Sequence, residues 1–120
     1  MNNSVFRFTL DLHKQDSQVF VPVRKGDTAF KLSARITESG TPYELTDGAS
    51  VVLAATCSDG SNKYGTATVT DNRIEITLPA NFVVKADTLA CCFQIGENSA
   101  ALSSPPFTIL VDDPAAPKQS

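Results

Sequence analysis

Apolar residues alternate with polar ones along several short segments of this chain, and this period of two constrains the fold more than any other feature. In residues 5–12 large apolar side chains occupy every second position, and residues 28–36 and 73–78 repeat the pattern. Residues 89–95 and 107–111 also place their large apolar side chains on one face. Because successive side chains of a strand point to opposite sides of a sheet, this pattern predicts strands with one buried face.

Two further segments predict strands with less regular patterns. Residues 19–23 are apolar with a proline inside, and residues 50–57 are apolar on both faces, which predicts a central strand covered on two sides. Glycine, aspartate and asparagine separate the strand segments at residues 38–41, 47–48, 59–61 and 71–72, as expected for turns that need positive φ angles. Residues 79–86 offer one short turn of helix at most.

This arrangement predicts an all-β fold, namely an antiparallel β-sandwich of about 7–9 strands. We expect an Ig-like topology, although the chain lacks the tryptophan of the Cys–Trp–Cys pattern that marks immunoglobulin domains. Phe8, Leu32, Ile76, Phe93 and Ile109 alternate in phase along their strands, so they should be buried together between the two sheets.

A chain of 120 residues is long enough for one domain with a core of its own. We expect residues 1–111 to form the sandwich domain. Residues 112–120 are rich in proline and alanine and predict a semi-extended linker or tail. Such a segment suits either the end of a small protein or the connection to a further part of a longer chain.

The composition, 42% hydrophobic and 19% charged, is typical of a folded globular protein. The net charge is −3 and the ten basic residues are scattered along the sequence, which argues against a nucleic-acid partner. No apolar run approaches the roughly 18–20 residues of a membrane helix. The first ten residues lack the basic start and apolar core of a signal peptide, so we expect no export through a cleaved signal.

The three cysteines cannot all pair within one chain. An odd count without a signal peptide predicts reduced thiols, with Cys57 and Cys91 as small core residues. A Cys57–Cys91 bridge is the alternative. A metal or redox site at Cys57, Cys91 and Cys92 has little support, because there is no CxxC motif and the one histidine, His13, is distant in sequence.

Other candidate sites are better explained as loops. Residues 25–27 read Lys-Gly-Asp, which looks like an adhesion tripeptide, but a glycine followed by aspartate between two strands predicts a turn. Asp59-Gly60 lacks the spaced carboxylates and the glutamate of an EF-hand loop, and the acidic pair Asp112-Asp113 should be solvated. His13 has no nucleophile nearby. We therefore predict no catalytic residue, cofactor, metal or small-molecule substrate.

Some large apolar residues lie out of phase with the core pattern or in loops, and they are the candidate protein interface: Phe20, Tyr43, Tyr64, Phe82 and Leu110. The alternative is that a loop covers the second face of each strand. Interfaces favour aromatic side chains at their centre, so we expect a docking patch for protein that is insensitive to salt and has no affinity for DNA or lipid.

Three segments taken in order resemble a known phage family: FRFTLDL at the start, VPVRKGDTAFKLSARITESGTPYELTDGASVVLAA in the middle and FTILVDD near the end. The resemblance is to the N-terminal domain of the upper baseplate protein, of the BppU type, of siphophages that infect Gram-positive bacteria. It extends over about residues 5–113. The Gly-Asp-Thr segment and the Gly-x-Pro-Tyr-x-Leu-Thr segment carry most of it, because alternating strands alone would match many sandwiches.

The resemblance implies a structural domain of the virion, without catalytic residues, that anchors the upper baseplate protein to the central tail hub. It also implies assembly in the cytoplasm of the bacterial host. In that family the chain continues into a part that forms trimers and carries receptor-binding proteins. This sequence lacks that part, so the resemblance supports hub docking and leaves trimer formation open. The alternative function is a sandwich-type binding or adhesion module, for instance for cell-wall carbohydrate, although the chain has no tryptophan and only two tyrosines for stacking on sugars.

Overall fold

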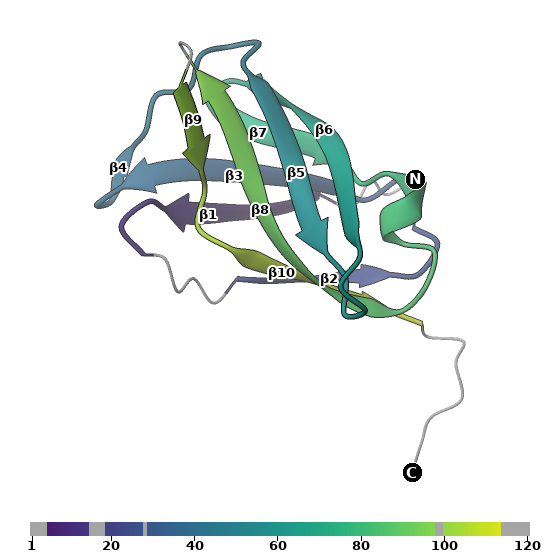
Figure 1. Ribbon diagram of the computed structural model, residues 1–120. Coiled ribbons are helices and arrows are strands. Elements are labelled where there is room, and N and C mark those ends of the chain that lie inside the picture. Colours follow the sequence, from purple (N-terminus) through teal and green to yellow (C-terminus); the bar gives the residue numbers. More distant parts are fainter. Residues whose placement is uncertain (1–4, 15–18, 28, 98–99, 114–120) are drawn as a thin grey trace.

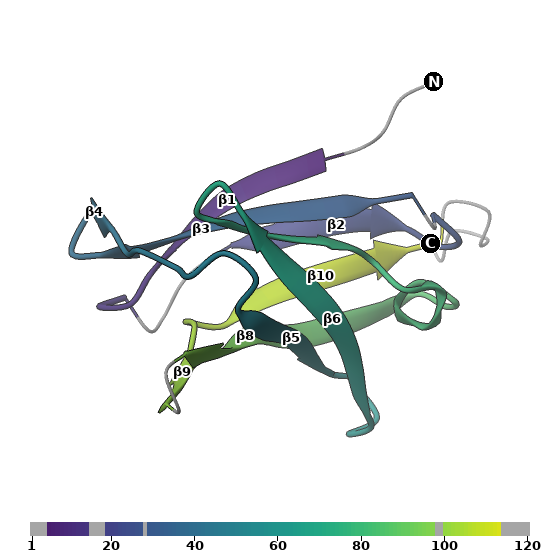
Figure 2. The same ribbon diagram turned by 90° about the horizontal axis from the view of Figure 1, so that it is seen from above.

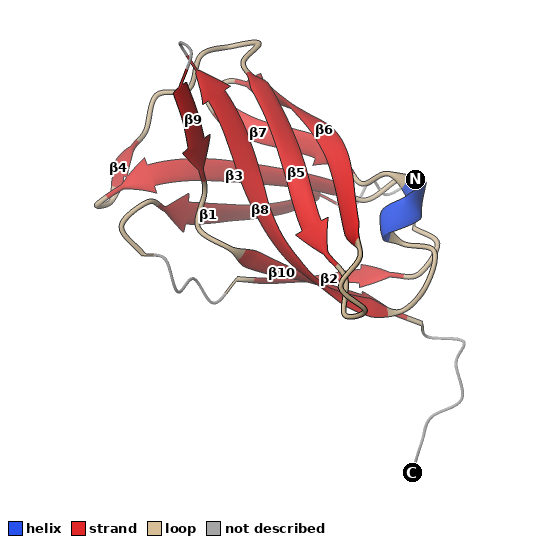
Figure 3. Cartoon of the chain, viewed as in Figure 1, coloured by secondary structure: helices blue, strands red, loops and turns tan. Residues whose placement is uncertain are grey.

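The alternating segments form strands in the computed structural model, which describes residues 5–14, 19–27, 29–97 and 100–113 (Figure 1). In chain order the elements of these ranges are β1 (Val5–Asp11), β2 (Phe20–Arg24), β3 (Lys31–Glu38), β4 (Thr41–Pro42), β5 (Ser50–Thr56), β6 (Asn62–Thr70), β7 (Arg73–Thr77), η1 (Ala80–Phe82), β8 (Asp87–Glu97), β9 (Ala100–Ser103) and β10 (Phe107–Asp112). Figure 3 shows strands throughout and one 3-10 turn, η1. The predicted all-β fold and the short helical turn within residues 79–86 are confirmed.

The strands form one continuous sheet with the order β1-β3-β7-β6-β5-β8-β10-β2, to which β4 is added on β3 and β9 on β8. The strand β6 joins its two halves, since Asn62 to Ala67 pair with β5 whereas Thr68 to Thr70 pair with β7. We call the half with β1, β3, β4 and β7 sheet A, and the half with β5, β8, β9, β10 and β2 sheet B. Figure 2 shows the two layers with β6 crossing from one to the other. The result is a nearly closed, barrel-like sheet.

The predicted antiparallel sandwich of seven to nine strands needs correction. Ten strands are present in the described ranges, and two pairings are parallel, namely β1 with β3 and β2 with β10. The chain leaves sheet A after β1, adds β2 to sheet B and returns to sheet A as β3, so β3 runs in the same direction as β1. The alternation of apolar and polar residues predicts which side of a strand is buried. It does not show whether two neighbouring strands run parallel or antiparallel, so the sequence did not reveal the two parallel pairs. The Ig-like topology is not confirmed.

The core lies between the inner sides of sheets A and B. The five residues predicted to be buried together, Phe8, Leu32, Ile76, Phe93 and Ile109, are at most 8% exposed and belong to one cluster, which confirms that prediction. Phe107 joins the two sheets, because its ring centroid lies 5.0 Å from that of Phe8 in sheet A and 5.2 Å from that of Phe93 in sheet B. Tilted aromatic pairs at such distances stabilise beyond the area they bury.

The predicted turns are present, and two of them show why their residue types are needed. Asp71 and Asn72 have φ angles of 52° and 59° and join β6 to β7 as a two-residue hairpin loop, a geometry that Asn and Asp tolerate. On the inner side of β6, a Cβ atom at Gly65 would lie 3.0 Å from Cδ1 of Ile76 and 3.1 Å from Cγ of Pro79. A larger residue at this position would therefore force Ile76 or Pro79 to shift where β6 passes close to the opposite layer.

At the C-terminal end of the predicted domain, β10 continues to Asp112, and residues 114–120 of the predicted linker lie outside the described residues. Within the described ranges no helix has the length and apolar character that a membrane span requires.

Candidate protein-docking surface

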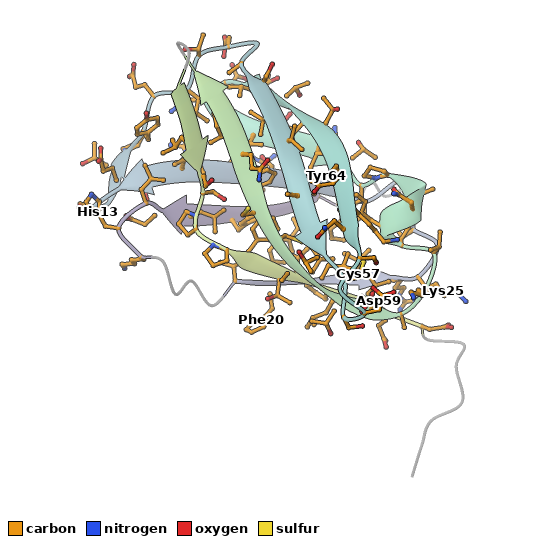
Figure 4. The ribbon with its side chains drawn as sticks, in the orientation of Figure 1. His13, Phe20, Lys25, Cys57, Asp59 and Tyr64 are labelled. Carbon is orange, nitrogen blue, oxygen red and sulfur yellow. The ribbon has the colours of Figure 1, made fainter. Side chains whose placement is uncertain are left out.

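The outer side of sheet B brings two of the predicted interface residues together. Phe20 on β2 and Leu110 on β10 are 52% and 38% exposed. The two strands pair in parallel with Phe20 beside Thr108 and Pro22 beside Leu110, so the two large side chains lie on the same face of adjacent strands. Figure 4 shows Phe20 at the periphery of the molecule.

This surface continues across the whole of sheet B. One row of outward side chains runs from Phe20 through Thr108, Ala90 and Thr56 to Asn62. We define the uncharged face as the outward residues of β2, β10, β8, β5 and β6 in this row and in the rows beside it. They are Phe20, Pro22, Thr108, Leu110, Thr88, Ala90, Cys92, Gln94, Val52, Ala54, Thr56, Asn62, Tyr64 and Thr66. None of these side chains is charged.

Tyr64 belongs to the uncharged face, whereas two other predicted interface residues do not. Tyr64 is 61% exposed and lies on β6 beside Ala54 of β5 (Figure 4). Tyr43 is half-buried and packs against the core. Phe82 is 2% exposed, so its prediction as a surface contact needs correction. Its place in η1 explains the burial, because this short turn directs Phe82 toward the core, and a three-residue turn has no periodicity that would reveal this in the sequence.

Charged residues begin at one end of the uncharged face. Arg24 and Asp112 are neighbours in the β2–β10 register, and Lys25 Nζ lies 3.3 Å from a carboxylate oxygen of Asp113. Asp113 is therefore ion-paired, unlike the fully solvated residue predicted. Beside these charges is a pocket of about 340 Å³ lined by Pro22, Val23, Arg24, Asp27, Phe30 and Asp112. Because apolar residues and charged residues of both signs line it, the pocket suits a side chain that has both apolar and polar parts.

Residues 25–27 form the predicted turn. Gly26 has a φ angle of 83°, and its amide donates to the carbonyl of Val83 at 2.7 Å. The amide of Lys25 donates to the carbonyl of Asp112, and the amide of Asp27 to that of Arg24. These bonds tie the turn to β10 and to the residue after η1, so a structural role accounts for the tripeptide.

The cysteines are free thiols, as predicted. Cys57 and Cys91 are buried on the inner side of sheet B, while Cys92 is half-buried on the uncharged face. Burial raises the pKa of the Cys91 thiol to about 12 and also raises that of Cys92. Both thiols are therefore protonated near neutral pH and poor nucleophiles. In Figure 4, Cys57 lies far from His13, which excludes a Cys–His pair between them.

The remaining polar candidates serve the loops. The Asp11 carboxylate accepts hydrogen bonds from the amides of His13, Ser39 and Gly40 and from Oγ1 of Thr37, at 2.8–3.1 Å. These bonds, that of the His13 amide first, lower the pKa of Asp11 far below its ordinary value. The Asp59 carboxylate accepts bonds from the amide and hydroxyl of Ser61, which is turn geometry. In the described part of the chain no cluster of three or more His, Cys, Asp or Glu residues could hold a metal ion.

Sequence reasoning missed most of the uncharged face. Val52 and Ala54 were expected to be covered by a second layer because residues 50–57 are apolar on both sides, yet both are only half-buried. Their apolar character was the available indication of an exposed apolar surface. Ala90, Cys92 and Pro22 join it through the strand order, which the sequence does not display.

No model of a known protein family matches the sequence, and no curated protein matches it. Among solved structures, the N-terminal domain of phage TP901-1 ORF48 is similar, with a TM-score of 0.66, 15% sequence identity, and coverage of 92% of this chain and 99% of that one. ORF48 is the baseplate protein BppU. The resemblance expected from the sequence is thus confirmed for the fold, since a likeness at this identity shows the fold alone.

Proposed function

We propose that this domain is a structural adaptor of a phage tail baseplate, located in the virion, that docks on the central tail hub through protein–protein contacts. The observation that carries the proposal is the shared fold with a phage baseplate domain over 92% of the chain. Fold alone does not fix function, so the site must supply the second argument.

The uncharged face supplies it. Phe20, Leu110 and Tyr64 are large exposed side chains on the same outer side of the sheet, and most residues between them have methyl or hydroxyl groups that are easily desolvated. Interface centres are depleted of charge and enriched in aromatic side chains. Five strands at about 4.8 Å spacing make the face about 19 Å across. This is smaller than one side of a standard interface, so the partner should also contact the rim at Arg24 and Asp112.

Binding through such a face should depend little on ionic strength, because neither side of the contact would bring together many charges. A tail-hub protein is the partner that we propose, and the host cytoplasm is the place of assembly. Trimer formation, if it occurs, belongs to other parts of a longer chain.

The proposal is tested by measuring binding to purified tail-hub proteins by calorimetry, with the variants Phe20→Ala and Leu110→Ser. Each should bind at least about fivefold more weakly, since truncating a large side chain that anchors an interface costs more than about 1 kcal/mol. Val5→Ser is the matched control, because Val5 is an exposed apolar residue, 41% exposed, on β1 in sheet A.

All three variants should unfold at the denaturant midpoint of the parent within error, since exposed positions contribute little to stability. If folded Phe20→Ala and Leu110→Ser bind the hub as tightly as the parent, the uncharged face is not the docking surface. If the parent binds no tail-hub protein, the proposed function is wrong.

A further inference from the structure

The outer side of sheet A has a composition opposite to that of the uncharged face. Its outward positions include Arg7 on β1, Lys31 and Arg35 on β3, and Arg73 and Glu75 on β7. We call these five residues the arginine face. They are exposed or half-buried, so their charged groups remain in contact with solvent.

The three arginines gather around one buried residue, Ser33. Arg7 is the cross-strand neighbour of Ser33 in the β1–β3 register, and Arg35 is two residues further along β3. Arg73 covers Ser33, because its Nε donates to the Ser33 hydroxyl at 2.7 Å and its Nη2 donates to the Ser33 carbonyl at 3.0 Å. The Arg73 guanidinium therefore reaches from β7 over Ser33 of β3, the strand that carries Arg35 and pairs with the strand of Arg7.

None of these three arginines forms an ion pair within the described part of the chain. No carboxylate there lies within 4.0 Å of Arg7, Arg35 or Arg73. Burial lowers the pKa of Arg73, and Arg35 and Arg7 lower it further, while Glu75 acts in the opposite direction. The Glu75 carboxylate accepts a hydrogen bond from the Ser33 hydroxyl at 3.3 Å. Arg73 has a structural role at Ser33, but like charges on neighbouring strands oppose folding, so the stability of the domain does not explain the presence of Arg7 and Arg35 beside it.

The charge distribution of the whole chain also sets this face apart. The five residues of the arginine face are four of the ten basic residues and one of the thirteen acidic residues, so together they carry a formal charge of +3. Asp11, at the end of β1, adds one carboxylate to the same outer side of sheet A. The chain as a whole has a net charge of −3, so all the other residues together carry −6. A concentration of positive charge on an acidic protein attracts a negatively charged partner and leaves the rest of the surface repulsive to it.

We propose that the arginine face is a second docking surface, which binds an acidic protein segment through aspartate and glutamate carboxylates. Guanidinium groups bind carboxylates in pairs of parallel hydrogen bonds, and Arg7 and Arg35 are free to do so because neither is held by a bond within the described residues. Glu75, the cross-strand neighbour of Ser33 on β7, favours a protein over a nucleic acid, because it would repel a continuous phosphate chain. A protein can place a neutral or basic residue opposite Glu75. This inference is independent of hub docking, since it rests on the other side of the molecule.

The test uses the full chain and a fluorescein-labelled poly-glutamate peptide, with binding followed by fluorescence anisotropy at low salt. The parent should bind the peptide, and its affinity should fall steeply as NaCl is added. The double variant Arg7→Gln/Arg35→Gln should bind at least about tenfold more weakly, as expected when charge-assisted hydrogen bonds are lost. Arg73 is left unchanged because it covers Ser33.

The matched control is Lys14→Gln/Lys85→Gln, which removes the same charge from exposed positions outside the arginine face and should change the affinity by about twofold at most. The melting temperatures of the parent and the arginine double variant show whether a loss of binding is due to unfolding. The double variant should be at least as stable as the parent, because repulsion between like charges is relieved. Equal peptide binding by parent and arginine double variant would overturn the proposal. A labelled DNA oligonucleotide of the same charge is tested in parallel. If it binds the parent more tightly than the peptide does, and binds the arginine double variant more weakly than the parent, the face is a nucleic-acid site and the proposal is wrong.

Discussion

Sheets A and B have outer faces of opposite character, although β6 makes them one continuous sheet. The uncharged face of sheet B carries aromatic, aliphatic and hydroxyl groups, while the arginine face of sheet A carries four cations and one carboxylate. The inner sides do not differ in this way, because both contribute apolar residues to one core. Alternation along each strand decides what is buried, whereas strand order decides which exposed groups become neighbours.

The comparison corrects an impression that the linear sequence gives. The basic residues are scattered along the chain, yet Arg7, Arg35 and Arg73 come together because β1, β3 and β7 are adjacent in sheet A. A modest net charge therefore conceals a strongly segregated surface. Each face should then respond to a different kind of partner, one through apolar contact and one through charge.

The largest expected effect concerns the core that both sheets share. Leu32 in sheet A and Phe93 in sheet B are fully buried. Truncating them in Leu32→Ala and Phe93→Ala should lower the free energy of unfolding by about 2–5 kcal/mol each. Urea denaturation followed by circular dichroism should show a single transition that moves to lower urea in both variants. Unchanged stability, or two separate transitions, would mean that the faces do not belong to one cooperative unit.

A smaller effect is expected at the junction of the two sheets. Gly65→Ala places a methyl group 3.0 Å from Cδ1 of Ile76 and 3.1 Å from Cγ of Pro79, so the variant should lose about 1–3 kcal/mol of stability. Gly96→Ala is the matched control in β8, where the nearest atom, the Ser50 carbonyl oxygen, would lie at 3.7 Å, an ordinary contact. Chemical denaturation of both variants measures the difference. Equal stability of the two would show that β6 does not approach the opposite layer so closely.

The end of sheet A at Asp11 should be sensitive to acid. The hydrogen bonds to its carboxylate lower the pKa of Asp11 in the folded protein, so the stability they provide is complete above the ordinary pKa of about 4 and is lost as the pH falls below it. Asp11→Asn should reduce stability at neutral pH, because its amide NH₂ would face N–H donors, either the His13 and Ser39 amides or the Gly40 amide. The variant should also flatten the loss of stability toward low pH. Melting temperatures between pH 7 and acid conditions test this, with the exposed Glu44→Gln as control. A variant that keeps the acid dependence of the parent would exclude Asp11 as its source.

The smallest structural perturbation is thiol labelling, which compares the inner and outer sides of sheet B. A thiol reagent added to the denatured, non-reduced protein should titrate all three cysteines, because all are free. In the folded protein Cys92 should react before Cys91, since Cys92 is half-buried on the uncharged face and the pKa of Cys91 is raised to about 12. Faster labelling of Cys91 would contradict the orientation of β8, and a count of one thiol would indicate a disulfide bond.

The strands that sequence reasoning found are those with large inward side chains, such as Phe8 in β1 and Leu32 in β3. It missed β6, whose inner positions include Gly65 and Ala67, because the close approach of the two layers leaves room only for small residues and removes the apolar signature of a strand. The candidate surface was partly predictable, since Phe20 and Leu110 stand out against buried neighbours. The extent of the uncharged face depends on which strands are adjacent in the sheet. The alternation of apolar and polar residues contains no information about the strand order.

The placement of β10 has a mechanical consequence. This strand is hydrogen-bonded on both sides, to β8 antiparallel and to β2 parallel, through most of its length. A force applied along β10 therefore loads both ladders in shear, so that many hydrogen bonds must yield together and none can be opened one at a time. By contrast, a force perpendicular to an edge strand would break its hydrogen bonds one after another, which requires a much smaller force. Tension along β10 would therefore pass into both neighbouring strands at once.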